Sequence, residues 1–368
     1  MLAYLIRRLL LIIPTLFGIM VLNFVVIQFV PGGPIERIIA ELQGLGGEAT
    51  ERFSGGGGET FEVADIAGDA RGTDSVYRGS QGLSPEFLAE LETLYGFDKP
   101  PLERFLLMIG NYLRFDFGTS YYRDVGVFEL VLEKLPVSIS LGLWSSLLIY
   151  AICIPLGIRK AITDGSKFDV YSSGVIGVGY AIPSFLFAIA LIVLFAGGRY
   201  YQWFPLRGLT SSNFEELSNL AKIKDYFWHL TLPLAAIVIN GFATLTMLTK
   251  NMFLEELHKP YVLTARAKGG SERRVFYGHI FRNAMLLIIA GLPSAFVSIF
   301  FTGSLLIEVI FSLDGLGLLA FEAIINRDYP VVLGTLYGFS LLGLIIVLIS
   351  DFVYTLVDPR IDFEARTS

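Results

Sequence analysis

The fold is decided by apolar stretches such as residues 137–158, which run VSISLGLWSSLLIYAICIPLGI and contain no charged side chain. A helix needs about 20 apolar residues to cross the hydrocarbon core of a bilayer. Five further stretches meet that requirement, at residues 9–30, 170–196, 231–249, 284–311 and 331–357. The sequence therefore predicts an all-α polytopic membrane protein with about six transmembrane helices. The first lies in an N-terminal segment, 1–30, and the other five lie in a core, 137–357.

The composition of the chain points to the same class of protein. The chain has 368 residues, of which 54% are hydrophobic and 17% are charged, and its mean hydropathy is +0.62. Soluble domains carry about a quarter charged residues, so lipid is the better solvent for this chain. Cys153 is the only cysteine and the three histidines are scattered, so we predict neither a disulfide within the chain nor a metal site.

A long hydrophilic insert, residues 31–136, separates the first two predicted spans. It carries 18 acidic and 9 basic residues, which accounts for the net charge of −6 and makes nucleic acid an improbable partner. Residues 44–82 are rich in glycine and acidic side chains, which predicts a mobile loop. Apolar residues at helical spacing predict amphipathic helices from Pro85 onward and around residues 102–113.

The orientation of the chain follows from the basic residues in its short loops. With the N-terminus inside, fourteen basic residues fall on the cytoplasmic side and five in the two shorter outer loops. The positive-inside rule then places both termini, including a tail at 358–368, in the cytoplasm, and makes the long insert extracytoplasmic.

The cytoplasmic loop at residues 250–283 has a pattern that a simple connection does not need. Pro260 suits the first turn of a short helix, and Gly269 with Gly270 breaks that helix. Ser271 can cap a second helix, which would have Val275, Phe276, His279 and Ile280 on one face. The predicted basic elbow could lie on lipid headgroups or dock in a groove of a partner protein. Alternatively, its basic side chains serve only to set the topology.

The loop closely resembles the coupling loop of dipeptide and oligopeptide ABC importer permeases. The resemblance rests on YVLTARAKG at 261–269, SERR at 271–274 and HIFRNA at 279–284. Other stretches match the family in order along nearly the whole chain: YLIRRL at 4–9, PGGP at 31–34, LYGFDKP at 94–100, RFDFGTS at 114–120, EVIFSLDGLG at 308–317, RDYPV at 327–331 and DPRI at 358–361. Within the family, the chain looks most like the microcin C and peptide permease of Gram-negative bacteria.

This resemblance implies a type I ABC importer permease fold in the inner membrane and import of peptides or peptide-like compounds by alternating access. It implies four kinds of partner: a second homologous permease, an ATPase with two ATP-binding domains, an extracytoplasmic peptide-binding protein and membrane lipid. In the family the loop inserts into a cleft of the ATPase. In the loop signature of the wider importer family, Thr264 and Ala265 occupy the places of the two alanines and Gly269 occupies the place of the glycine. Leu263 stands where many importers have Glu. The residues implied in coupling are Tyr261, Val262, Thr264, Ala265, Arg266, Ala267, Lys268, Gly269, Ser271, Glu272 and Arg282.

A second group of residues is a candidate for the substrate path or an outer gate. Glu308 falls inside the fifth predicted span, where an ionisable group indicates either a functional site or a side chain that reaches interfacial water. Asp314, Gly315 and Gly317 form a tight outer turn that could face substrate or could merely need backbone with positive φ. Asn240 could line a polar path or bond to a neighbouring helix.

The motifs that the chain lacks restrict its function further. There is no Gly-x-x-x-x-Gly-Lys-Ser/Thr phosphate loop and no nucleophile or metal motif, so we predict a permease rather than an enzyme. No cofactor is expected on this chain, and ATP and Mg would bind to the partner ATPase. The alternative is an ion-coupled secondary transporter, which would need several ionisable residues at the bilayer centre, where only Glu308 and Asp351 are candidates.

Overall fold

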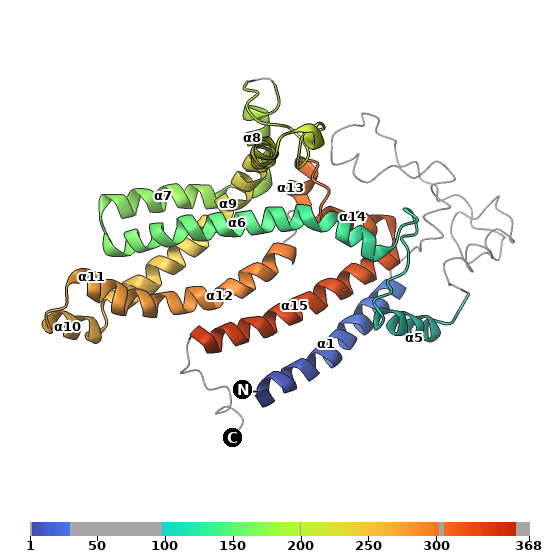
Figure 1. The fold of residues 1–368 in the computed structure, drawn as a ribbon, viewed down its shortest axis with the longest axis horizontal. Coiled ribbons are helices and arrows are strands. Elements are labelled where there is room, and N and C mark those ends of the chain that lie inside the picture. Colours follow the sequence, from blue (N-terminus) through green and yellow to red (C-terminus); the bar gives the residue numbers. More distant parts are fainter. Residues whose placement is uncertain (1, 30–97, 199, 302–304, 358–368) are drawn as a thin grey trace, which may run out of the picture. The chain divides into compact units, whose positions relative to one another are not determined.

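The computed structural model describes residues 2–29, 98–198, 200–301 and 305–357 (Figure 1). Helices make up most of these residues, and an isolated bridge between Thr119 and Gly126 is the β-pairing found within them. The prediction of an all-α chain is confirmed. The Gly-rich stretch 44–82, the helix expected from Pro85 and the tail 358–368 lie outside the described residues.

The main helices are labelled in Figure 1, and the longest connection between them in the described part of the core lies between α8 and α9. Their bounds are α1 Leu2–Phe29, α5 Pro101–Tyr112, α6 Val127–Ile162, α7 Lys167–Ala181, α8 Ser184–Phe195, α9 Asn219–Leu257, α10 Pro260–Ala267, α11 Glu272–Val275, α12 Phe281–Phe301, α13 Leu305–Ile310, α14 Leu316–Asn326 and α15 Tyr329–Val357. A 3₁₀ turn, Phe214–Glu216, precedes α9, and a π-helical turn, Phe276–Ile280, joins α11 to α12.

Four of the described helices are long and apolar enough to cross a membrane: Ile6–Ile27, Val127–Ile162, Asn219–Leu257 and Tyr329–Phe352. The stretch 170–196 differs from the single span expected for it, because α7 and α8 meet at 93°. Pro183 causes the break, since the residue before a proline avoids helical backbone and Ile182 is extended there. The fifth predicted span, 284–311, is covered by α12 and α13 on either side of residues outside the described ranges.

The chain divides into two compact units, and each is described by itself. The first unit comprises Met1–Ile12, Leu135–Gly317 and Leu342–Ser368. Within it, α9 packs against α7, α8 and α12. Apolar residues near the start of α9, among them Leu230 and Leu234, form a buried cluster with Ala188 of α8 and with Ile307 and Phe311 around α13.

The second unit comprises Ile13–Lys134 and Leu318–Leu341. Its α5 confirms the amphipathic helix expected near 102–113. Tyr112, Phe117 and Tyr337 make edge and tilted ring contacts in its core. The buried Asp328 carboxylate accepts hydrogen bonds from the Ser120 hydroxyl and from the Tyr121 backbone N–H.

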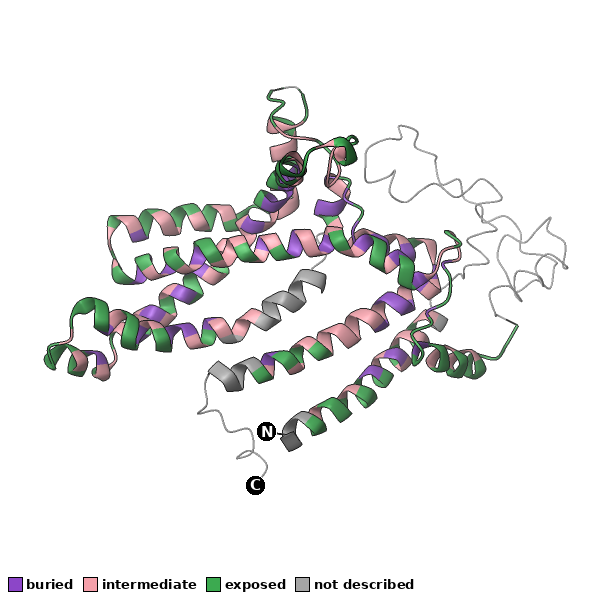
Figure 2. Cartoon of the chain, viewed as in Figure 1, coloured by how far each residue is buried: buried purple, intermediate pink, exposed green. Residues whose placement is uncertain are grey.

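Exposed positions, drawn green in Figure 2, run along α7 in the first unit, and several of them carry large apolar side chains. Val170 is 62% exposed, Val175 is 73% exposed and Val178 is 67% exposed. Such a surface is costly in water and suits contact with lipid or with another chain. This surface fits the membrane class that the composition indicates.

Candidate coupling site

The loop after α9 forms the helix expected at 260–268. Lys259 has extended backbone at the N-cap position and Pro260 occupies the first turn of α10, where its missing N–H costs no helical hydrogen bond. On this helix Val262 is fully buried, whereas Leu263 is 67% exposed. One face of α10 therefore packs inward and the opposite face is open.

The Glu256 carboxylate fixes the start of α10 to the end of α9. It is buried, and it accepts hydrogen bonds from the Lys259 ammonium and from the Tyr261 hydroxyl. The hydrogen bond that Lys259 donates to Glu256 raises the pKa of Lys259, and burial together with this carboxylate raises the pKa of the Tyr261 hydroxyl. Lys259 therefore stays charged and Tyr261 stays neutral near pH 7, and both keep donating to Glu256.

The two glycines at the end of α10 are needed for different reasons. Gly269 has φ of +80°, a left-handed backbone that residues with a Cβ rarely adopt, and the space around it is open. A Cβ on Gly270 would lie 2.9 Å from the Ala265 carbonyl oxygen and 3.1 Å from Val275 Cγ2. Backbone conformation therefore selects glycine at 269, and close packing selects it at 270.

The second limb of the elbow begins at Ser271, as expected. The Ser271 hydroxyl accepts a 3.4 Å hydrogen bond from the Arg274 backbone N–H, which caps α11. Arg266 Nε lies 3.0 Å from Glu272 Oε1, so an ion pair joins the two limbs across the glycines. This pair is exposed, and we count it as a small contribution to stability.

The π-helical turn changes which residues share a face on the second limb. We expected Val275, Phe276, His279 and Ile280 together, but Val275 and Ile280 are buried whereas His279 is exposed. A π-turn brings residues i and i+5 into line, which matches the spacing of Val275 and Ile280. The expectation for His279 was wrong because it assumed an unbroken α-helical period.

A buried apolar cluster holds the elbow against the helices that carry it. Phe253 of α9 and Ala161 of α6 join residues from both limbs of the loop and from α12. These residues are Val262, Val275, Ile280, Ala284, Met285 and Ile288. Because protein interiors pack densely, a movement of α10 requires a movement of the ends of α6 and α9.

Most of the residues implied in coupling lie on the open side of the elbow. Val262 is buried and therefore holds the elbow to its own chain, and Tyr261 and Ala265 are half-buried. The remaining implied residues are exposed: Thr264, Arg266, Ala267, Lys268, Gly269, Ser271, Glu272 and Arg282. Sequence analysis missed Phe253 and Glu256 because it ended the fourth span at residue 249. The sequence signal was the run of apolar residues that continues past residue 249 through Met252, Phe253, Leu254 and Leu257, which extends the helix and places Glu256 within it.

The structure brings together three of the five residues proposed for the outer gate. Glu308 is only 1% exposed, and Cβ atoms on Gly315 and Gly317 would lie 2.7 and 3.1 Å from atoms of its carboxyl group. The glycines are thus needed because the Glu308 side chain fills the space beside them. The positive φ that we expected in this turn belongs to Ser312, at +51°.

The other two residues of that group differ from Glu308 in their exposure. Asp314 is exposed at the turn. Asn240 is half-buried in α9, beyond the α9 residues that pack against Ile307 and Phe311. Across the described ranges, no three His, Cys, Asp or Glu side chains are placed to hold a metal ion.

Comparisons with known proteins agree with this architecture. The family described as "Binding-protein-dependent transport system inner membrane component" matches residues 153–363. The chain is 60% identical over 367 residues to the peptidoglycan transport system permease protein YejB of Agrobacterium fabrum, covering 99% of both chains. It is 58% identical to the inner membrane ABC transporter permease protein YejB of Escherichia coli O157:H7, covering 99% of this chain and 100% of the relative. It is 32% identical to the oligopeptide transport system permease protein AppB of Bacillus subtilis, again covering 99% of this chain and 100% of the relative.

Proposed function

The chain belongs to the family of inner membrane components of binding-protein-dependent transport systems, and from that premise we propose that it imports peptides or peptide-like compounds, driven by a separate ATPase. Two relatives are named for oligopeptide and peptidoglycan transport, and these names support a substrate with peptide bonds. Microcin C-like peptides remain our finer proposal for the cargo.

The observation that carries this proposal is the two-sided elbow. Its inner side is anchored by Val262, Val275 and the Glu256 carboxylate. Its outer side leaves Leu263, Thr264 and a set of basic residues uncovered. A helix that is fixed to its own chain and open on the other face suits docking in a groove of a partner, which here would be the ATPase.

The mechanism that we propose is alternating access. ATP and Mg would bind to two ATPase domains on partner chains, and closure of these domains would push the elbow as a lever. A second homologous permease would complete the translocation path, and an extracytoplasmic binding protein would deliver the peptide to the outer side. Both termini would then lie in the cytoplasm, and chemistry would occur on the ATPase rather than on this chain. Family membership favours this mechanism over an ion-coupled secondary transporter.

Purification from gently solubilised membranes tests the docking role. We expect an ATPase to co-purify with the wild-type chain, and Leu263→Arg to reduce its recovery by at least about tenfold, because a large positive charge that the family does not carry at this place would enter an apolar contact. Ile162→Arg is the control, since Ile162 is also exposed, at 57%, at the end of α6 on the same predicted side. Full recovery of the ATPase with the Leu263 variant would contradict the docking role, and a wild-type chain that purifies without an ATPase would contradict the proposed function.

Gly269 tests the lever. Gly269→Val places a β-branched residue at φ of +80°, which costs about 1–2 kcal/mol and distorts the joint between the limbs. We expect fewer peptides imported per ATP hydrolysed. Gly269→Asn is the control, because asparagine tolerates left-handed backbone. Unchanged uptake by the Gly269→Val variant, at a normal level in the membrane, would count against the lever.

A further inference from the structure

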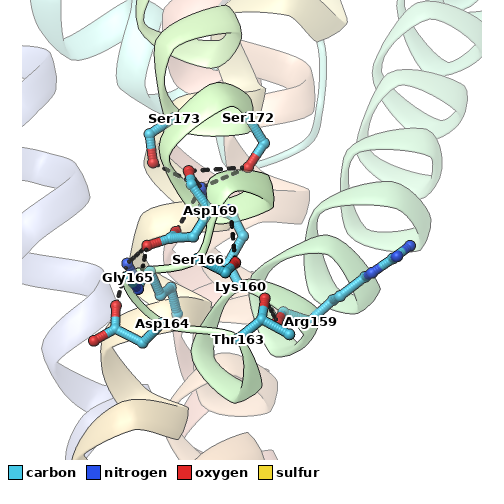
Figure 3. Close-up of polar contacts among 10 residues, drawn as sticks. Arg159, Lys160, Thr163, Asp164, Gly165, Ser166, Asp169, Ser172 and Ser173 are labelled. Carbon is cyan, nitrogen blue, oxygen red and sulfur yellow. Dashed lines mark hydrogen bonds and ion pairs between the residues drawn. The ribbon is translucent and has the colours of Figure 1, made fainter.

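A charged cluster at the turn between α6 and α7 has no part in the function described so far. Its members are Lys160 of α6, Asp164 in the turn, Asp169 of α7 and Lys250 of α9. Figure 3 shows Lys160, Asp164 and Asp169 with the hydroxyl groups around them. Two positive and two negative charges balance here, and three of the side chains, Lys160, Asp169 and Lys250, are largely shielded from water, whereas Asp164 is 48% exposed.

Lys160 is the most deeply buried member, with no exposed surface. Its ammonium group donates to the Asp169 carbonyl oxygen at 2.8 Å, to Ser172 Oγ at 2.8 Å and to Ser173 Oγ at 2.7 Å. These three bonds use all three of its N–H groups. The Asp169 Oδ1 atom, 2.9 Å away, then supplies the opposite charge, so Lys160 locks α6 to the first turns of α7.

Lys250 extends the cluster to α9. Its ammonium group lies 2.7 Å from Asp169 Oδ2 and 2.8 Å from Asp164 Oδ1. The Gly165 backbone N–H donates to the same Asp169 oxygen at 3.2 Å, which orients the carboxylate between the two lysines. Asp169, which is part of α7, therefore connects this helix to α6 through Lys160 and to α9 through Lys250.

The charged cluster lies next to the apolar cluster that holds the elbow. Ala161 follows Lys160 directly and Phe253 lies one turn after Lys250, and both belong to the apolar cluster. One turn earlier, α6 and α9 meet so closely that a Cβ on Gly157 would lie 2.6 Å from Thr249 Cβ. Ion pairs and close packing thus hold the α6–α7 turn against the last turns of α9, the helix that leads into α10.

We propose that Asp164, Asp169, Lys160 and Lys250 are positioning residues that make the α6–α7 turn follow the elbow during transport. This inference rests on the proposed function. If the elbow moves with the ATPase, the rigid end of α9 carries the movement, and Lys250 transfers it to α7 through Asp169. Without this link the elbow would still move with ATP hydrolysis, but the displacement of α7 that accompanies each movement of the elbow would be smaller.

The double variant Lys250→Met/Asp164→Asn isolates the link. It removes one positive and one negative charge and leaves Lys160 paired with Asp169, so no buried charge loses its balance. The complete transporter in proteoliposomes is supplied with ATP and an isotope-labelled tryptic peptide mixture, and ATP hydrolysis and peptide uptake are measured together. We expect ATP hydrolysis within about twofold of wild type and uptake per ATP reduced about tenfold, within the usual range of coupling between sites.

Two further variants separate positioning from general stability. Lys250→Arg keeps the charge and should restore most of the uptake per ATP. Lys222→Met removes a lysine of the same helix whose partner, Glu215, is 91% exposed, and it should change neither quantity. If the double variant assembles poorly, Asp164→Asn alone can be used, because its carboxylate is half-exposed and its loss should disturb folding less. This variant removes only the ion pair between Asp164 and Lys250, so it should give a smaller fall in uptake per ATP.

Measurements on the wild-type complex test the proposed function, and measurements on the variants test the role of the charged cluster. A wild-type complex without ATP-driven uptake would overturn the proposed function and this inference with it. A wild-type complex with normal uptake would overturn the inference alone if uptake per ATP were unchanged in an assembled Lys250→Met/Asp164→Asn or Asp164→Asn variant. A fall in hydrolysis and uptake in equal proportion would also overturn it, because that result indicates loss of stability only.

Discussion

Single atoms decide how closely helices approach each other in the first unit. Gly157 of α6 and Gly241 of α9 both lie where a Cβ would overlap the facing helix, at 2.6 Å from Thr249 Cβ and 2.4 Å from Ile149 Cδ1. Small residues let membrane helices pack backbone to backbone, where dispersion rather than exclusion of water holds them together. These two positions set the distance between α6 and α9.

Gly157→Ala should therefore destabilise the protein by about 1–3 kcal/mol, the usual cost of overpacking. The added methyl group would meet the Thr246 carbonyl oxygen at 2.8 Å as well as Thr249, and backbone cannot move aside easily. The measurement is the midpoint of thermal unfolding in detergent. Gly177→Ala in α7 is the matched control, since no atom lies within 4 Å of its added Cβ, and equal midpoints for the two variants would contradict the packing argument.

Asp328 should make the stability of the protein depend on pH. Burial raises the pKa of its carboxyl group, and the bonds from Ser120 and Tyr121 only partly oppose this shift. A raised folded-state pKa contributes stability that is complete below about pH 4 and is lost as the pH rises through the folded value. Asp328→Asn removes this loss, so the midpoint of thermal unfolding of the variant should improve relative to wild type between pH 4 and pH 7.

Ser120→Ala provides the second arm of this test. It removes the hydroxyl that stabilises the ionised carboxylate, so the pKa of Asp328 should rise further and the loss of stability should extend to higher pH. A constant difference between wild type and Asp328→Asn over this range would refute the assignment.

At the scale of elements, the elbow is held by a helix cap that can be tested alone. Ser271→Ala removes the side-chain oxygen that accepts from the Arg274 N–H, which should cost about 1 kcal/mol. Ser218→Ala is the control, because Ser218 has the N-cap position of α9 without a side-chain cap bond. Thermal unfolding of both variants should show a loss for Ser271→Ala that exceeds the loss for Ser218→Ala, and the reverse order would refute the role of the cap.

Elements also show where prediction from sequence succeeds. Pro260 and Ser271 act through their nearest neighbours in the chain, so α10 and the start of α11 followed from the sequence. The π-helical turn at Phe276–Ile280 and the 93° bend between α7 and α8 did not. The apolar positions around Phe276–Ile280 fit an unbroken α-helical period, so they do not indicate the π-turn. Pro183 marks a break at the bend, but a proline does not set the bend angle, which depends on how α7 and α8 pack against α9.

At the scale of the whole molecule, the orientation in the membrane is the decisive prediction. In a Cys153→Ala background, Ser212→Cys should react with a membrane-impermeant maleimide in cells with a permeabilised outer membrane. Lys268→Cys should react only after the inner membrane is opened, because the elbow is predicted to be cytoplasmic. Both positions are exposed, so accessibility within the chain does not limit either reaction. Reaction of Lys268→Cys in intact inner membranes would reverse the topology and remove the basis for ATPase docking.

By itself, the sequence determined the membrane class, the positions of most apolar helices, the predicted orientation and the local form of the elbow. Hydropathy, charge placement and capping depend on residues close together in the chain, so they can be inferred without a structure. Only the tertiary structure decided that Glu308 lies against Gly315 and Gly317, and that Lys160 and Lys250 share Asp169. Lys250 and Asp169 belong to helices far apart in sequence, and a buried charge has no sequence pattern that names its partner. The energy of such a pair depends on distance and on exclusion of water, which only the folded chain sets.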